Sequence, residues 1–347
     1  MHLLDCSDII ARAWKAYGGE KKIKTIADVS AKVSTNYVFK ILFTDSTFIL
    51  TKLSFFGKYE IFCEDHTIIN VLANNLPHPY QNFLARSLTK NNELFTYRLT
   101  EGIVDVWVVF YHAVDIKEKM PRRLDELHIK ALGRELALFH KACSGVRKIL
   151  PPSSINVIKD IEQLLDILCT AEGMSEHGRH HDVISEQCHI FLNNLEKLNY
   201  RSFETIPVFV DWNIGNFSVT ADCKFYSRWD YDWFRISSRV LDFYFFSRVT
   251  SDIGDRTTFS YLPDTLMEER FLLFLKEYHN YYPLTEKEIL FFKEAYRFFI
   301  LNYVIKHGNY FFTPIFAKRL QREAYKLYFN QIEEKLDTGK ILKALKI

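Results

Sequence analysis

Glycine is scarce in this chain, with 12 residues among 347, and the glycine-rich patterns that cradle phosphates are absent. The sequence contains neither GxGxxG nor GxxxxGK[ST], the signatures of Rossmann dinucleotide-binding proteins and of P-loop enzymes. It also lacks GxSxG, the nucleophile motif of α/β-hydrolases. On motif grounds, these absences exclude three large groups of α/β enzymes.

Closely spaced cysteines are missing as well. Six cysteines are spread along the chain without a CxxC pair, which in a chain of this length indicates reduced thiols in a cytosolic protein. Cysteine and histidine gather between residues 169 and 189, but their spacings do not match the close ligand pairs of a zinc site. We therefore expect a cytoplasmic protein, no zinc site, and a solvent-exposed loop in the region where these cysteines and histidines gather.

Neither a strong net charge nor a long apolar run is present. The formal net charge is +2, which gives no argument for binding to nucleic acid or to an anionic membrane. Charges interrupt every apolar stretch before the ~18 residues that a membrane-spanning helix needs. The N-terminal residues have no basic leader and instead predict an amphipathic helix that ends at Gly18 and Gly19. We expect a monomer or homodimer that binds neither nucleic acid nor membrane.

Aromatic residues are abundant, at 16% of the composition, and we interpret most of them as helix packing. The first part of the chain alternates apolar and polar positions in the manner of strands, with one inserted helix at residues 60–72. The predicted strands are 26–33, 37–43, 46–53, 94–99 and 103–110.

The chain after residue 112 is dominated by helical periodicity. Helices are predicted at residues 124–143, 155–170 and 183–198. A capping box at residues 285–288 opens a long aromatic helix that Gly308 is expected to close. The sequence thus predicts an α+β fold in two lobes. Residues 1–110 form a small lobe with a five-stranded antiparallel sheet and one main helix, 111–347 form a larger, mostly helical lobe, and the hinge is at 109–116.

Two apolar runs of the larger lobe each end in a carboxylate. Asp211 ends the first run, Asn216 stands five residues later, and Asp230 ends the second run. A carboxylate at a strand end can orient a hydroxyl or accept its proton, and one amide oxygen with one carboxylate suits Mg²⁺. Turn capping is the alternative for Asp211 alone, and a polar turn is the alternative for residues 230–232. The combination favours phosphoryl transfer.

A lysine and a short polar turn of the smaller lobe complete the pattern. Lys52 lies late on the polar face of the strand at 46–53, from where a lysine can reach nucleotide phosphates. Glu64 on the next helix is expected to hold it, with Glu60 as the second choice, while a surface lysine on an edge strand is the alternative. Ser34 and Asn36, in the turn before residue 37, are expected to contact phosphates.

The order of these residues resembles the aminoglycoside phosphotransferase and choline kinase family, which has a protein kinase-like fold. Residues 131–140 (ALGRELALFH) resemble its LGxxLAxLH helix, residues 211–216 (DWNIGN) resemble its HGDxxxxN catalytic loop, and Asp230 matches the metal-binding Asp of its IDxx motif. The resemblance spans roughly residues 30–250 and rests on both order and spacing. One departure is that Phe209 and Val210 replace the usual His-Gly pair, which supports the loop and eases its turn.

The resemblance implies a role for each matching residue. Lys52 would contact the phosphates of ATP or GTP while paired with Glu64, and Asp211 would be the catalytic carboxylate. Asn216 and Asp230 would hold Mg²⁺. Asp242 would support the catalytic loop, and the nucleotide would lie between the lobes near Phe110 and His112.

The acceptor is expected to be small, and the aromatic residues near the motifs suggest its character. Trp212, Trp233 and Asp232 combine aromatic faces with a carboxylate, which suits a cationic ligand, although core packing is the alternative for each ring. Asp232 is also a possible second metal ligand. We therefore expect a Mg²⁺-dependent kinase for an aminoglycoside-, choline- or sugar-like acceptor. The alternative is a pseudokinase that binds nucleotide as a regulatory module; a protein kinase is disfavoured because no activation segment follows Asp230.

Overall fold

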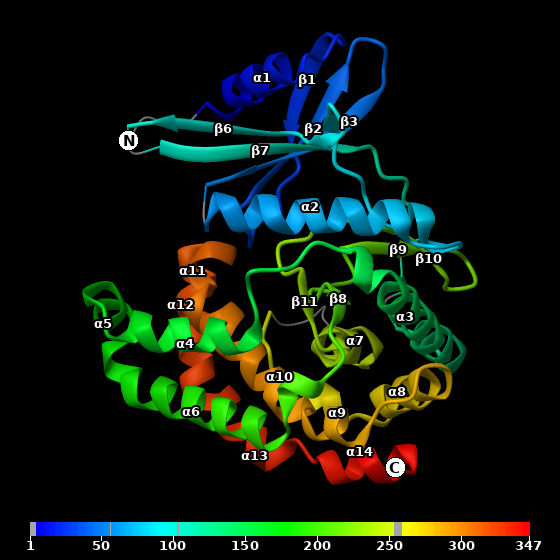
Figure 1. The fold of residues 1–347 in the computed structure, drawn as a ribbon, viewed down its shortest axis with the longest axis vertical. Coiled ribbons are helices and arrows are strands. Elements are labelled where there is room, and N and C mark those ends of the chain that lie inside the picture. Colours follow the sequence, from blue (N-terminus) through cyan, green and yellow to red (C-terminus); the bar gives the residue numbers. More distant parts are fainter. Residues whose placement is uncertain (1–4, 56, 103, 119, 122, 253–258) are drawn as a thin grey trace.

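A five-stranded antiparallel sheet stands above a mostly helical part in the computed structural model of the chain (Figure 1). The structure describes residues 5–55, 57–102, 104–118, 120–121, 123–252 and 259–347. The prediction of an α+β fold with a small sheet-containing lobe and a larger helical lobe is confirmed. No helix within the described ranges is both long and apolar enough to cross a bilayer.

The sheet has the strand order β1-β2-β3-β7-β6, and each neighbouring pair is antiparallel. Its strands are β1 (Ile23–Asp28), β2 (Tyr37–Phe43), β3 (Phe48–Ser54), β6 (Thr96–Glu101) and β7 (Val104–His112). The predicted range matches β2 and lies within two residues at each end of β3, β6 and β7, whereas β1 begins three residues and ends five residues earlier than predicted; Ile103 lies outside the described residues. Lys52 lies opposite Val109 of β7 and belongs to β3, the central strand of the sheet, so it is not on an edge strand.

Helix α1 (Cys6–Tyr17) packs on this sheet and ends, as expected, at Gly18, which adopts a left-handed conformation with φ 84°. Its Trp14 contacts Phe43 and Phe110, with ring centroids 5.0 and 5.4 Å apart. These rings belong to a small core between α1 and the sheet, to which the strands contribute the side chains of one face.

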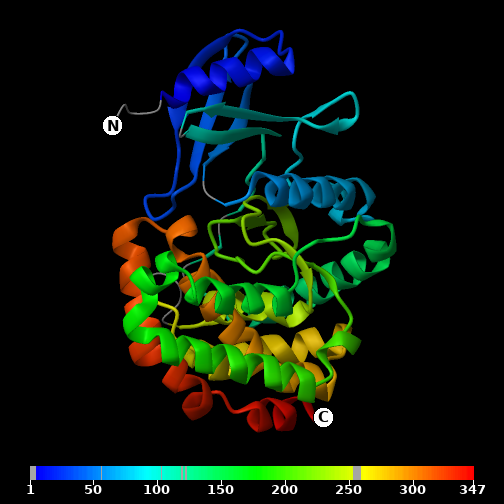
Figure 2. The ribbon, with the colours of Figure 1, turned by 60° about the vertical axis from the view of Figure 1, so that its left-hand side comes forward.

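Helix α2 (Tyr59–Asn75) lies between the sheet and the helical part in both views (Figures 1 and 2). Its buried residues Ile68, Ile69 and Leu72 belong to the core of the larger lobe rather than to the small core. The helix is therefore a shared wall between the lobes. The domain boundary near residue 110 stays a prediction, since α2 packs across it.

The larger lobe contains the remaining helices and four short strands. The helices are α3 (Glu126–Val146), α4 (Val157–Leu168), α5 (Ala171–His177), α6 (His181–Lys197), α7 (Phe243–Thr250), α8 (Glu269–Tyr281), α9 (Glu286–Leu290), α10 (Phe292–Phe299), α11 (Gly308–Phe311), α12 (Pro314–Glu323), α13 (Phe329–Lys335) and α14 (Thr338–Leu345). The strands are β8 (Ile206–Val208), β9 (Phe217–Val219), β10 (Phe225–Arg228) and β11 (Arg235–Ser237). A further short hairpin, β4 (Thr89–Lys90) and β5 (Glu93–Leu94), belongs to the small lobe.

Two helix predictions needed correction. The loop expected in the region of residues 169–189 is wrong over Ala171–His177, which form α5; Thr170 caps this helix by accepting the backbone N–H of Gly173, and the helix predicted at 183–198 is present as α6. The capping box of Thr285 and Glu288 is present. However, the helix it opens is divided into α9, α10 and a π-helical stretch over Ile300–Lys306, and Gly308 begins α11 instead of closing a single helix.

Close packing of α3 against α8 explains the glycine in the ALGRELALFH segment. A Cβ atom on Gly133 would lie 2.5 Å from the backbone oxygen of Phe274, so any larger residue would push the two helices apart. Leu132, Leu136 and Phe139 are buried on the same face. This segment therefore fixes a helix pair beneath the candidate site.

Candidate active site

The loop between β8 and β9 carries the first predicted carboxylate. The Asp211 side chain accepts hydrogen bonds from Asn216 Nδ2 to Oδ2 at 2.9 Å and from the backbone N–H of Asn213 to Oδ1 at 3.1 Å. Because the amide nitrogen of Asn216 faces Asp211, its carbonyl oxygen is turned away from that carboxylate. The two residues that the sequence placed five positions apart thus form one hydrogen-bonded unit.

Asp242, which follows the motif residues in sequence, lies beneath this loop. It is fully buried, and its Oδ1 accepts the backbone N–H groups of Phe209 and Val210 at 2.9 and 2.6 Å. Its other oxygen lies 3.0 Å from His140 Nε2, and His140 Nδ1 lies 2.8 Å from the hydroxyl of Tyr278. Burial lowers the pKa of His140, although Asp242 opposes this shift. The histidine at the end of the α3 motif thus connects the loop to α8.

Val210 occupies the place where the family resemblance expects glycine, and its backbone has a φ of 58°. A β-branched residue in the left-handed region is a genuine outlier and costs about 1–3 kcal/mol. The two N–H bonds to Asp242 hold the strained residue in place. The loop therefore keeps the turn that glycine would make easily, despite the substitution.

Arg228, at the end of β10, is a residue that the sequence argument missed. It is fully buried, donates from Nη2 to the backbone oxygen of Asp211 at 3.0 Å, and lies over the rings of Phe209 and Trp212, with its guanidinium carbon 4.6 and 4.3 Å from their centroids. Burial lowers its pKa, and the charge of Asp211 opposes this shift. The signal in the sequence is an arginine two residues before Asp230, where the surrounding residues are apolar.

The second predicted carboxylate group lies next to the first. The backbone N–H of Trp229 donates to the carbonyl of Asn216 at 3.0 Å, which brings the residue preceding Asp230 against the loop. Asp230 is exposed and has a φ of 66°. An amide oxygen and carboxylate oxygens are therefore gathered at one edge of the larger lobe.

Lys52 of the smaller lobe reaches this edge. Its Nζ contacts Asp232 directly and lies 3.9 Å from Asp230. Lys52 is buried, which lowers its pKa, while the charge of Asp230 opposes the shift. A basic group from β3 thus faces the carboxylates of the larger lobe across the space between them.

The predicted pairing of Lys52 with Glu64 is wrong in this structure. Glu64 accepts hydrogen bonds from the backbone N–H and hydroxyl of Ser154, at 2.6 and 3.1 Å. Glu60, the second choice, lies 3.3 Å from Arg98. On α2, the charge of Lys52 acts on His66. Burial is the main cause that lowers the pKa of His66 to about 3, and the lysine charge lowers it further.

The turn with Ser34 and Asn36 lies over the same edge. Asn36 Nδ2 donates to Asp232 Oδ2 at 2.8 Å. Ser34 pairs with Phe312 as an isolated bridge, and the N–H of Thr313 donates to the carbonyl of Val33 at 3.0 Å. The turn is therefore fastened to the larger lobe on both sides of the predicted phosphate contacts.

We predict that Thr313→Pro loosens this turn without disturbing the fold. Thr313 has a φ of −59°, which proline adopts, and Phe312 is extended at φ −120° and ψ 144°, as a residue before proline must be. The variant loses one hydrogen bond of about 1 kcal/mol, so hydrogen exchange in peptides over residues 29–38 should be about fivefold faster. Thr313→Ala keeps the N–H and should exchange as the wild type; equal rates in both variants would contradict the fastening.

The predicted hinge residues Phe110 and His112 both form backbone hydrogen bonds with the segment at residues 86–88. Phe110 is fully buried against Trp14, and its carbonyl accepts the N–H of Leu88 at 2.8 Å. His112 is exposed, and its N–H donates to the carbonyl of Arg86 at 2.9 Å. The Phe110 side chain is therefore a core residue, while His112 lies at the edge between the lobes.

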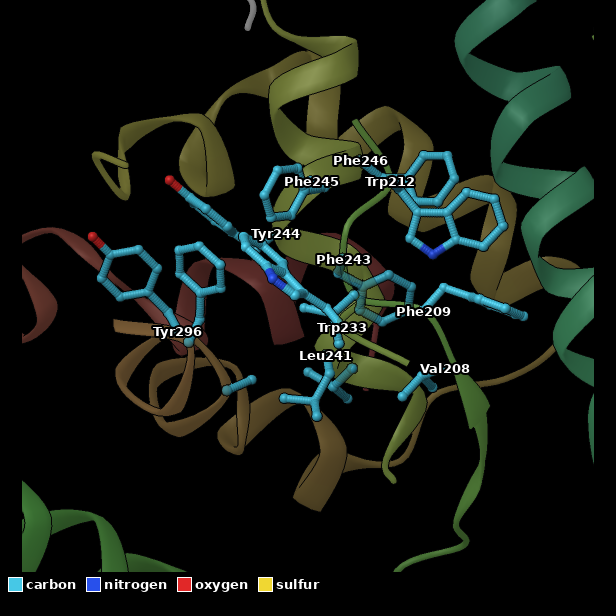
Figure 3. Close-up of a cluster of buried hydrophobic side chains, with 14 of the residues drawn as sticks. Val208, Phe209, Trp212, Trp233, Leu241, Phe243, Tyr244, Phe245, Phe246 and Tyr296 are labelled. Carbon is cyan, nitrogen blue, oxygen red and sulfur yellow. The ribbon is translucent and has the colours of Figure 1, made fainter. Parts of the chain in front are cut away.

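A cavity of about 700 Å³ opens beside Asp232. Its walls come from α2, α4, α5, the segment after Asp230 and residues 302–311. Trp233 lines it and stacks on Tyr303 at 4.6 Å. Trp212 does not line it, which corrects the prediction of an acceptor contact. Trp212 is fully buried beside Phe246, at 4.9 Å, in the aromatic cluster of Figure 3.

The oxygen groups at this edge suit a hard divalent cation. Asn216 can offer an amide oxygen, and Asp230 and Asp232 offer carboxylates, a donor set that matches Mg²⁺ in proteins. Lys52 now neutralises the carboxylates, which shows that the position favours positive charge. Within the described parts of the chain, no three His, Cys, Asp or Glu side chains gather as a metal site.

Comparison with known proteins supports the fold. No protein-family model matches the chain, and no curated protein matches it in sequence. Among solved structures, the chain is similar to amicoumacin kinase hAmiN in complex with AMP-PNP, Ca²⁺ and Ami, with a TM-score of 0.65, 12% identity and coverage of 97% of both chains. It is also similar to a type I macrolide 2′-phosphotransferase, with a TM-score of 0.53, 10% identity and coverage of 89% of this chain and 94% of that one.

A third similar structure is spectinomycin phosphotransferase APH(9)-Ia in complex with ADP and spectinomycin, with a TM-score of 0.51, 14% identity and coverage of 97% of both chains. At these identities the likeness shows the fold alone. The chain therefore has the two-lobe fold of these antibiotic phosphotransferases over nearly its whole length.

Proposed function

We propose that this chain is a small-molecule kinase that transfers the γ-phosphate of ATP or GTP to a hydroxyl group of a small acceptor. The observation that carries the proposal is the hydrogen-bonded pair of Asp211 and Asn216 beside Asp230, facing Lys52 across the lobes. Phosphoryl transfer requires positioned phosphates, positive charge and an aligned acceptor oxygen. Each of these requirements has a residue at this edge.

The proposed chemistry assigns roles to the residues of the loop and the strand. Asp211 orients the acceptor hydroxyl and accepts its proton, while the acceptor oxygen bonds to the γ-phosphorus and the nucleoside diphosphate leaves. Asn216 and Asp230 would hold Mg²⁺, with Asp232 as a further ligand; when bound, the ion supplies positive charge to the phosphates. Lys52 exchanges its carboxylate partners for phosphate oxygens.

The turn and the cavity give the two substrates separate places. The nucleotide would lie between the lobes from His112 to the turn at Ser34 and Asn36, and the acceptor would occupy the cavity beside Asp232. Trp233 and Tyr303 provide aromatic faces there, which suit an aminoglycoside- or choline-like cation as well as a sugar ring.

A thermal-shift experiment tests the nucleotide site. ATP and GTP, each with and without Mg²⁺, are compared for the wild type and Asp230→Ala. We expect a Mg²⁺-dependent rise in melting temperature that is lost in the variant, because a ligand at 100 times its Kd stabilises the folded state by about 2.7 kcal/mol. Absence of a shift with every nucleotide would sink the proposal. Mg²⁺-dependent binding without transfer or hydrolysis would support the pseudokinase alternative instead.

A further inference from the structure

Three consecutive residues of α2, Glu64, Asp65 and His66, have three different surroundings. Glu64 holds Ser154, and His66 contacts the hydroxyl of Tyr111 through Nε2. Asp65, between them, lines the cavity beside Asp232. Because successive residues of a helix are turned by about 100°, the helix presents one carboxylate to the cavity and another to the loop around Ser154.

Asp65 lacks a partner for one of its oxygens. The side chain is half-buried, and its Oδ1 atom is buried without a hydrogen-bond partner among the described residues. Leaving a buried carboxylate oxygen unpaired is costly, and native proteins rarely do so without a reason. An occupant of the cavity that brings a donor or a positive charge would remove this cost.

Three other carboxylates of the cavity wall have partners. Asp160 receives Arg235 at 3.0 and 3.1 Å and Lys306 at 2.9 Å. Glu176 accepts from two side-chain amides, at 2.6 and 2.8 Å, and Asp232 receives Asn36 and Lys52. Arg235 and Lys306 are therefore already engaged by Asp160, the third basic residue of the wall, Lys58, is exposed, and Oδ1 of Asp65 accepts a hydrogen bond from none of them.

The net charge of the cavity wall also favours a positively charged occupant. Six acidic side chains and three lysine or arginine side chains line the cavity, and the pKa of His66 and of His307 is lowered to about 3, mainly by burial, which keeps both neutral. Asp166 and Glu172 are exposed at the rim. The cavity thus has an excess of negative charge, which attracts cations.

We propose that Asp65 is a specificity-determining residue for the acceptor, whose carboxylate binds a positively charged nitrogen of that molecule. The proposal rests on the proposed function and adds a role for α2: the helix recognises the acceptor from the smaller lobe instead of holding Lys52. An acceptor bound between Asp65 and the wall formed by α4 and α5 contacts both lobes at once, which favours their approach.

The protonation of Asp65 makes the proposal measurable. Burial raises the pKa of this carboxyl to about 8, although Arg235 opposes the shift. An acid whose folded-state pKa exceeds its unfolded value destabilises the fold increasingly as the pH rises from about 4 to about 8. Asp65→Asn removes this effect. The variant should therefore melt at or above the wild-type temperature, with an advantage that grows over that pH range.

Calorimetry without nucleotide tests the binding role. The probes are kanamycin A, spectinomycin and choline, with glucose as an uncharged comparison, against wild type, Asp65→Asn and the control Glu162→Gln. Glu162 is exposed on α4 and does not line the cavity. We expect the wild type to bind a cationic probe, Asp65→Asn to bind it at least tenfold more weakly, and Glu162→Gln to bind it within twofold of the wild type.

The pH profile separates a binding role from a structural one. The quaternary charge of choline does not titrate, so a rise in choline affinity between pH 6.5 and 8.5 in the wild type, absent in Asp65→Asn, reports ionisation of Asp65. Equal affinities in wild type and Asp65→Asn, or binding of no cationic probe, would overturn the proposal. Loss of the nucleotide-dependent thermal shift is measured independently, so failure of the kinase proposal is distinguishable from failure of this one.

Discussion

Replacing Asp211 by Asn should lower the rate of phosphate transfer by about 10²–10⁴-fold, the usual contribution of a positioned general base. The amide cannot accept the proton of the acceptor hydroxyl, yet it fills the same space beside Asn216 and Asn213. We therefore expect the fold and the nucleotide affinity to be retained while kcat falls. The measurement is the rate of nucleoside diphosphate release with an acceptor found by screening amino sugars and choline-like amines.

The control for this experiment is a carboxylate of the same lobe outside the site. Asp222 is exposed in the turn before β10 and pairs with Lys224 at 2.9 Å, so Asp222→Asn should keep wild-type kinetics. If Asp211→Asn also kept its turnover, Asp211 would be a capping residue of the loop, which is the alternative that its position after a strand allows.

The larger part of the candidate site was predictable because short stretches of sequence determine it. Asp211 and Asp230 stand at the ends of apolar runs, which places polar side chains at the end of a strand or just beyond it, and Asn216 follows Asp211 by five residues. The helix at 131–140 could be predicted for the same reason, since its apolar residues repeat with helical spacing. A few residues of sequence were sufficient in each case.

The partners of these residues could not be predicted in the same way. Which of Glu60, Glu64, Asp65 and His66 faces Lys52 depends on how α2 is rotated against the sheet, and one residue of error turns the helix by about 100°. Tertiary packing sets that rotation. The contact of Ser34 with Phe312 joins positions 278 residues apart, and no local pattern contains it.

Trp212 and Trp233 show a second limit. Each directly follows an aspartate of the site, and each has an aromatic face of the kind that binds a cationic ligand. The structure buries Trp212 against Phe225, with ring centroids 5.1 Å apart, and leaves Trp233 in the cavity wall. The two rings differ in their packing partners, since Trp212 packs on Phe225 and Trp233 packs on Tyr303, and no local sequence pattern contains either contact.

Removing the Asp242 side chain should destabilise the protein by about 3–5 kcal/mol, because each buried donor that loses its acceptor costs about 1–3 kcal/mol. Asp242→Ala leaves the N–H groups of Phe209 and Val210 and the ring of His140 without their acceptor. The strained φ of Val210 then loses the two hydrogen bonds that Asp242 provides, so the adjacent Asp211 should also shift. Urea denaturation, read from the midpoint at an unchanged slope, measures the loss.

Asp242→Asn is the matched variant, because its oxygen can still accept both N–H groups and its new amide can donate to His140 Nε2 when that nitrogen is unprotonated. Its loss should be closer to 1 kcal/mol, the value of one ordinary hydrogen bond. The two variants together separate the roles of the acceptor and of the charge. If Asp242→Ala unfolded at the same urea concentration as the wild type, the loop would be held by Arg228 and the surrounding rings instead, and the strain at Val210 would need no carboxylate to maintain it.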